Sequence, residues 1–259
     1  MRTRLAPTPS GFVHEGNLVN FLVITHVADT FDAAVALRID DIDHTRVRDA
    51  YIDDIFRVLT WLEIPWTDGP RSAADMPQWT QHQRLDRYQR AREELRMTGL
   101  AYHCACSRTQ WNTFTGDSCP GECRHRNLPF HVGRTATRLH LDGVPDPIIW
   151  RRDDLPAYHL TSVVDDHHGR VDLVVRGEDL QASTDVQRLI SRAMPDNTFH
   201  QALVVHHPLV TLEGRKLSKS AGAQASPLML SADVLATVSK VAASYSASAE
   251  SALLRNLEC

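Results

Sequence analysis

The 259-residue sequence has no hydrophobic run long enough to cross a membrane. Every apolar stretch falls short of the ~18 consecutive residues that a membrane helix needs. A signal-peptide pattern is also missing, because Met1-Arg2-Thr3-Arg4 is followed almost directly by a proline-rich loop. With 42% hydrophobic and 23% charged residues, the composition is that of an ordinary globular protein. We therefore expect a cytoplasmic location.

The sequence also lacks an excess of positive charge, and its formal net charge is −4. Proteins that bind nucleic acid tightly and without sequence preference are normally basic. A nucleic-acid partner, if there is one, must therefore be held by a local patch or by a few specific contacts. Internal repeats and low-complexity runs are absent as well.

Alternation of apolar patterns predicts an α/β fold. Strand-like and helix-like segments alternate over the first 100 residues, which favours a Rossmann-type doubly wound parallel sheet. We expect a first catalytic half over 1–100, an insertion over 101–130, a second half over 131–225 and a helical tail over 226–259. The predicted strands are 3–6, 33–39, 135–141, 148–152, 171–175 and 203–211, and the predicted helices are 18–29, 49–63, 83–98, 185–193 and 232–245.

The stretch from Ala6 to Asn17 combines two prolines and two glycines with a histidine where the first helix begins. Its order predicts strand, tight loop and helix. The first N–H groups of a helix are unpaired and favour anions, so His14 could join them in binding a phosphate. A plain turn with a surface histidine is the alternative.

Four of the five cysteines cluster as Cys-x-Cys and Cys-x-x-x-Cys, separated by twelve residues. Two close pairs joined by a short loop predict a structural zinc site with four thiolate ligands. Disulfides are the rival in an oxidising compartment, and four unrelated buried thiols are a third possibility. The predicted ligands are Cys104, Cys106, Cys119 and Cys123, with His103 and His125 as spare candidates.

A basic stretch, Glu213 to Ser220, follows the predicted strand at 203–211. Its lysines, Lys216 and Lys219, have small hydroxyl residues beside them and suit a loop that grips phosphates; a solvated basic loop is the alternative. Acidic residues Asp40 to Asp43 end a buried strand, which is where open α/β sheets bind ligands.

Together these motifs resemble the class I aminoacyl-tRNA synthetases. Pro-Ser-Gly-x-x-His-x-Gly-Asn near the start and Lys-Leu-Ser-Lys-Ser about 200 residues later look like the two ATP motifs of that class. The stretch Leu-Arg-Ile-Asp-Asp-Ile-Asp and the segment from Trp150 to Thr184 are similar to the glutamyl branch, which also has cysteine-bearing insertions. The resemblance covers roughly residues 2–222.

This resemblance implies a ligase that forms an aminoacyl adenylate from ATP with Mg²⁺. Its catalytic groups would be His14, Lys216 and Lys219. The ATP-binding residues it implies are Ser10, Gly11, His14, Gly16, Asn17, Lys216 and Lys219.

For the amino acid, the resemblance implies glutamate. Two arginines would bind its carboxylates, because a guanidinium can hold a carboxylate through two hydrogen bonds; ordinary surface ion pairing is the alternative for both. The acid would hold the α-ammonium. The implied residues are Arg4, Thr8, Asp40, Tyr158 and Arg176.

Some positions depart from the family pattern. The family has Glu where Asp40 stands, usually Ser where Thr8 stands and typically Asn where His159 stands. Asn17 replaces the second histidine of the class motif, a change that the glutamyl branch tolerates. A shorter acid and a larger hydroxyl residue would reshape the pocket, so the amino acid is plain glutamate only if the backbone compensates.

Fewer than forty residues follow Ser220. We therefore expect no anticodon-binding domain, and the chain is most similar to the stand-alone glutamyl-queuosine tRNA(Asp) synthetases. That implies transfer of glutamate to queuosine in the anticodon of tRNA(Asp), by a monomer without membrane partners. Two alternatives stay open: an acceptor that is not tRNA, and a non-catalytic paralogue.

Overall fold

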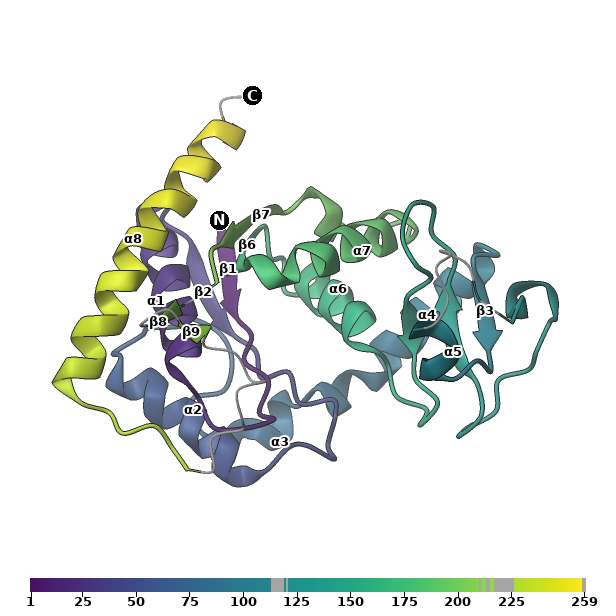
Figure 1. Ribbon diagram of the computed structural model, residues 1–259, viewed down its shortest axis with the longest axis horizontal. Helices are drawn as coiled ribbons and strands as arrows, with labels where there is room; N and C mark the ends of the chain where they lie inside the picture. The colour runs from purple at the N-terminus through teal and green to yellow at the C-terminus, as the bar shows by residue number, and fades with distance from the viewer. Residues whose placement is uncertain (113–118, 120, 210, 213–214, 217–225, 258–259) are drawn as a thin grey trace. The chain divides into compact units, whose positions relative to one another are not determined.

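A computed structural model describes residues 1–112, 119, 121–209, 211–212, 215–216 and 226–257 (Figure 1). The chain divides into two compact units, and neither is one continuous segment. The first contains Met1–Gln83, Val171–Gln181 and Ala202–Cys259, and the second contains Arg84–Arg170 and Ala182–Gln201. The predicted division into catalytic halves, insertion and tail stays a prediction.

Parallel strands form the centre of the first unit. Strand β1 (Arg2–Leu5) pairs with β2 (Ala34–Leu37), and β6 (Leu173–Gly177) pairs with β7 (Leu203–His207), both in parallel. The two pairs adjoin where the Asp172 N–H donates to the Arg2 carbonyl at 3.1 Å. Strands β1 and β6 therefore start side by side, and the loops that follow them leave from the same edge.

Two long helices lie side by side in the first unit (Figure 1). Helix α1 (Glu15–Thr30) is apolar on nearly every side and buries most of its residues. Helix α8 (Ala232–Leu257) packs against it and against β7. The amphipathic helix α2 (Asp49–Trp61) adds Ile52, Ile55 and Leu59 to the same core. Shorter elements are η1 (Ala73–Asp75), α3 (Met76–Trp79), η2 (Gln81–Arg84), η4 (Glu178–Leu180), β8 (Thr211–Leu212) and β9 (Arg215–Lys216).

An antiparallel sheet of three strands and a pair of packed helices build the second unit. The strand order is β3-β4-β5, and helix α4 packs against α6. The elements are α4 (Leu85–Met97), β3 (Ala101–Cys104), α5 (Arg108–Asn112), η3 (Cys123–His125), β4 (Ala136–Leu139), β5 (Ile148–Trp150), α6 (Tyr158–His168), α7 (Gln181–Arg192) and η5 (Phe199–Gln201).

The parallel α/β arrangement predicted for the start of the chain is confirmed by β1, α1, β2 and α2. Helix α6 and strand β3 were not predicted, and α8 runs twelve residues beyond the expected end at 245. Among the residues described, no helix combines the length and the apolar character that a membrane crossing requires.

Candidate functional site

The loop between β1 and α1 is held where it meets the helix. Helix α1 begins after His14, whose N–H donates to the Asn17 side-chain oxygen at 3.2 Å. One residue earlier, the Val13 N–H donates to the buried Asp54 carboxylate at 2.8 Å. The prediction that His14 stands at a helix start is therefore confirmed. Asn17 supports the loop, while Ser10, Gly11 and Gly16 lie in or directly beside it.

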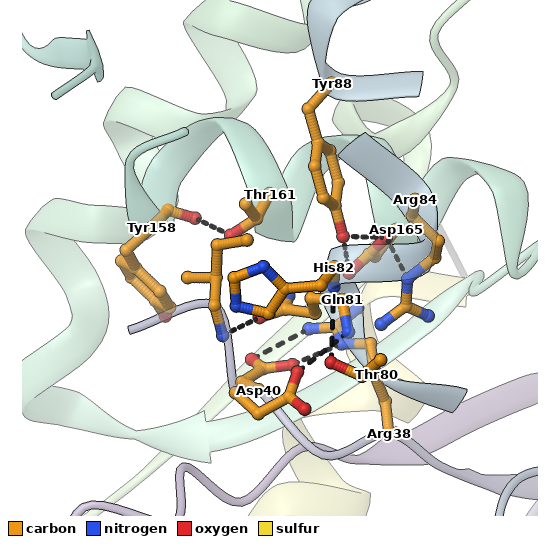
Figure 2. A network of polar contacts seen from close by, with 12 residues as sticks. Arg38, Asp40, Thr80, Gln81, His82, Arg84, Tyr88, Tyr158, Thr161 and Asp165 are labelled. Carbon is orange, nitrogen blue, oxygen red and sulfur yellow. Dashed lines mark hydrogen bonds and ion pairs between the residues drawn. The ribbon is translucent and has the colours of Figure 1, made fainter. Parts of the chain in front are cut away.

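The acidic end of β2 meets this loop. The Asp40 N–H donates to the Pro7 carbonyl at 2.9 Å, which brings Asp40 beside the segment that contains Thr8. The Asp40 carboxylate accepts hydrogen bonds from the Arg38 Nε at 2.7 Å and from the Arg38 Nη2 at 3.3 Å (Figure 2). Both side chains are about one-tenth exposed. An ion pair thus holds the acid in one orientation.

Gln81 ties a second segment to the end of β2. Its backbone N–H donates to Asp41 at 2.7 Å, and its side-chain oxygen accepts from the Ile42 N–H at 2.9 Å. Gln81 is almost fully buried, so these bonds fix the chain directly after the acid. The neighbouring His82 and Thr80 point toward the same polar cluster in Figure 2. Sequence reasoning included Asp41 in the acidic end of the strand but missed Arg38 and Gln81. Alternate residues of an extended segment share a face, which could have paired Arg38 with Asp40.

The predicted carboxylate-binding arginines lie on the neighbouring strands β1 and β6. Arg4 is 7% exposed and Arg176 is 4% exposed. Ordinary surface ion pairing, the alternative for both, is therefore wrong. Buried guanidinium groups need anionic or polar partners. Both residues lie on strands whose carboxyl ends face the edge where the loop after β1 and the Asp40 segment meet.

Tyr158 belongs to the second unit, where it begins α6. It is 42% exposed, and its ring contacts that of His159 at a centroid distance of 5.4 Å. Its carbonyl accepts from the Thr161 hydroxyl at 3.1 Å. An exposed phenol at a helix start is available to a ligand, which agrees with its predicted role without testing it.

Further along α6, a buried carboxylate joins this helix to α4. The Tyr88 hydroxyl lies 2.8 and 2.9 Å from the two oxygens of Asp165, and Arg84 lies 3.4 Å from one of them (Figure 2). Sequence reasoning did not find this network. The adjacent acids Asp165 and Asp166 inside an otherwise apolar segment were the available signal, because buried acids need partners.

The basic stretch is described only in part. The backbone of Lys216 lies in β9, opposite Thr211 of β8. Lys219, with Ser218 and Ser220, lies outside the described residues. The predicted phosphate contacts of Lys216 and Lys219 therefore stay predictions.

In the second unit, four cysteine sulfur atoms lie within 4.8 Å of one another, and all four side chains are buried. The Sγ atoms of Cys104 and Cys106 both lie 3.4 Å from that of Cys119, and Cys106 lies 3.7 Å from Cys123. These separations exceed a disulfide bond of ~2.05 Å. The thiols are free, and they can act together as four ligands of one metal ion.

The surroundings fit a metal centre. A Cβ added at Gly121 would lie 2.7 Å from the Cys106 sulfur, so any other residue there would displace the sulfur or the backbone. Burial and the neighbouring thiols raise the pKa of Cys106; a bound cation would reverse that shift, because metal ligands are thiolates. His103 turns to Thr137 and Phe130 instead, and His125 is outside the group of close ligands among the described residues.

Comparison with known proteins agrees with this arrangement. The family "tRNA synthetases class I (E and Q), catalytic domain" matches residues 1–129 and 133–234. Glutamate–tRNA ligase of Borrelia recurrentis (strain A1) is 31% identical over 87% of this chain and 51% of that protein. Glutamate–tRNA ligase 2 of Coxiella burnetii (strain Dugway 5J108-111) is 32% identical over 86% and 51%.

A solved structure shows the same fold. Glutamate-tRNA synthetase from Elizabethkingia anophelis superposes with a TM-score of 0.65 at 22% identity, over 85% of this chain and 52% of that one. The chain spans about half the length of the curated relatives that it matches. Since the family match covers most of its residues, the chain belongs to the class I aminoacyl-tRNA synthetases of the glutamyl and glutaminyl type.

Proposed function

We propose that this protein activates glutamate as an adenylate and transfers it to queuosine in the anticodon of tRNA(Asp). The activation step rests chiefly on one observation. Arg4 is buried on β1, the strand that runs into the loop before His14. The neighbouring strand β6 carries the buried Arg176. Two desolvated cations next to an anion-binding helix start suit a substrate with two carboxylates and a nucleotide.

In the proposed reaction, an oxygen of the glutamate α-carboxylate attacks the α-phosphorus of ATP. A bond forms between them, the bond from the α-phosphorus to the bridging oxygen breaks, and pyrophosphate leaves. Charge grows on the phosphate oxygens, so the protein acts by positioning and electrostatic stabilisation. His14 would donate to a phosphate, and Lys216 and Lys219 would hold the β- and γ-phosphates. Mg²⁺ would accompany ATP.

Amino-acid selection would use the buried arginines and the acid. Arg4, Arg176 and Tyr158 would bind the carboxylates, and Asp40 would bind the α-ammonium with Thr8 nearby. Glutamine would offer the arginines a neutral amide in place of a carboxylate, and a site built to bind one group can strongly reject an analogue that lacks it.

Pyrophosphate exchange tests the activation step. The protein, ATP, labelled pyrophosphate and each of the standard amino acids are combined, and label entering ATP is measured. We expect exchange with glutamate above all others. Exchange with no amino acid would exclude activation and favour the non-catalytic paralogue.

Transfer tests the acceptor. We expect labelled glutamate to become attached to tRNA(Asp) that contains queuosine. We expect no attachment when periodate has first oxidised the queuosine diol. Labelling of the tRNA 3′ end, or of a small molecule or carrier protein, would replace queuosine as the proposed acceptor. Because the chain matches only about half the length of its relatives, this experiment has to identify the acceptor.

A second candidate is activation of a related amino acid. The bidentate Arg38–Asp40 pair favours it, because the acid is one methylene shorter than in the family and is already engaged by a cation. An exchange maximum with an amino acid other than glutamate would establish this alternative.

The cysteine cluster is proposed to hold a structural zinc ion. Cys104, Cys106, Cys119 and Cys123 supply the four soft ligands that a closed tetrahedral zinc site uses. Bound zinc would join the end of β3 to η3 and leave no position for substrate. We also propose that the protein is a cytosolic monomer, and sedimentation velocity measures its mass in solution.

A further inference from the structure

The segment just before the basic stretch is fixed by His207. This residue ends β7 and is 4% exposed. Its Nε2 lies 2.9 Å from the Asn20 side-chain oxygen, and its Nδ1 lies 2.8 Å from the Pro208 carbonyl. Asn20 is on α1, three residues after Asn17. The end of β7 is thereby joined to the helix that begins at His14.

Leu209, two residues later, is held by its backbone. Its N–H donates to the Glu178 carboxylate at 3.1 Å. Its carbonyl accepts from the Tyr245 hydroxyl at 3.2 Å. The Tyr245 ring, on α8, also stacks on the His207 ring at 5.8 Å and 22°. Side chains from η4 and α8 therefore occupy both backbone groups of the last described residue before position 210.

On the far side of the basic stretch, the chain is fixed again at Leu228. Its carbonyl accepts from the Arg57 guanidinium at 3.1 Å. Arg57 also donates to one oxygen of Asp54, at 2.6 and 3.0 Å. The other oxygen of Asp54 accepts from the Val13 N–H. One buried carboxylate thus connects the loop before His14 to the segment that returns from the basic stretch.

We propose that Arg57 and Tyr245 are positioning residues for adenylate formation. Arg57 joins Leu228, through Asp54, to the Val13 N–H beside His14. Tyr245 joins Leu209 to α8, which packs against α1. The inference rests on the proposed ATP chemistry. Adenylate formation depends on several phosphate-binding groups being placed together, and misplacement of reacting groups by 1 Å can cost on the order of 10²-fold in rate.

Simple packing of α8 is the competing explanation, and the chain offers a matched control. The Thr30 hydroxyl donates to the Glu250 carboxylate at 2.9 Å, so the pair also joins α1 to α8. It lies at the opposite end of α1 from His14, and both side chains are solvent-accessible. Losing this bond removes a helix–helix contact without touching Leu209 or Leu228.

The experiment measures steady-state pyrophosphate exchange by the full chain as Tyr245→Phe, Arg57→Ala, Arg57→Lys and Glu250→Ala. We expect kcat to fall about tenfold for Tyr245→Phe and further for Arg57→Ala, while the KM for the amino acid stays within about twofold. Arg57→Lys restores part of the rate because it keeps the charge. Glu250→Ala keeps the wild-type kcat.

If the wild-type enzyme is active and kcat is unchanged in both Tyr245→Phe and Arg57→Ala, the inference is overturned. It is also overturned if kcat falls in proportion to the melting temperature in all variants, Glu250→Ala included. If the wild-type protein exchanges with no amino acid, the proposed function fails. The anchors are then judged by ATP affinity in titration calorimetry. A Kd raised at least about fivefold in Arg57→Ala supports them, and a Kd equal to that of the wild type, or no ATP binding by the wild type, overturns them.

Discussion

At the scale of single residues, Asp40 is the proposed partner of the α-ammonium group of the amino acid. We expect Asp40→Asn to raise the KM for the amino acid by about 10- to 100-fold, because a charge-assisted hydrogen bond contributes roughly 1.5–3 kcal/mol. The KM for ATP should change less than twofold. Pyrophosphate exchange at varied substrate concentrations measures both values. Asp43→Asn is the control, since that acid pairs with the exposed Arg46. If Asp40→Asn had the same KM for the amino acid as Asp43→Asn, Asp40 would not bind the amino acid.

Gly121 is a residue-scale constraint on the cysteine cluster. A methyl group there would meet the Cys106 sulfur at 2.7 Å and push it from its position. We expect Gly121→Ala to weaken zinc binding by about 10- to 100-fold, as changes beside metal ligands commonly do. Competition with a chromophoric chelator measures the affinity. Glu122→Gln changes an exposed neighbour and should bind zinc normally; equal affinities for the two variants would refute the steric argument.

Individual residues differ in how well the sequence predicted their place in the candidate site. Arg4 and Arg176 were named as candidate cations because of the family resemblance, and the structure buries both of them on neighbouring strands, while their role in binding carboxylates stays a prediction. The engagement of Asp40 by Arg38 was not predicted, since the sequence pattern places both residues on one face but does not show which side chains form an ion pair. Gly121 gave no signal, because a glycine required by close approach looks like any other glycine.

Among the elements, the pairing of α4 with α6 depends on a polar contact. We expect Tyr88→Phe to lower the free energy of unfolding by about 1–3 kcal/mol, because the buried Asp165 carboxylate loses a hydroxyl donor. Urea denaturation of the full chain measures it. Tyr51→Phe is the control: its hydroxyl has no hydrogen bond within the described structure, so it should change stability by less than ~0.5 kcal/mol. If Tyr88→Phe and Tyr51→Phe lowered the free energy of unfolding by similar amounts, the hydrogen bond to Asp165 would not explain the effect.

The elements that sequence predicted are those with a clear apolar period. Helix α2 repeats Ile52, Ile55 and Leu59 at helical spacing, and β6 is a short β-branched run. Helix α6 was missed because Asp165 and Asp166 interrupt its apolar face. Strand β3 was missed because it ends in the cysteine segment, where pairing with β4 rather than local pattern determines the structure.

For the whole molecule, the two units should respond to different ligands. We expect a zinc chelator to lower the melting temperature of the second unit by about 5–10 °C, since a loss of 1 kcal/mol shifts a domain of this size by about 4–8 °C. ATP should raise the melting of the first unit, which contains the loop before His14. Calorimetry of the full chain resolves both effects. A chelator that shifts both transitions equally would contradict a structural role confined to the cysteine cluster.

The contact between α1 and α8 also sets an order of events on the ribosome. Helix α1 is complete at Thr30, whereas the helix that covers it begins at Ala232. At about 5–20 residues per second, synthesis of the intervening chain takes on the order of 10–40 s. Throughout that time the apolar side chains of α1, including Phe21, Leu22 and Ile24, lack part of their final cover. The nascent chain therefore leaves part of this apolar segment uncovered until α8 has been synthesised.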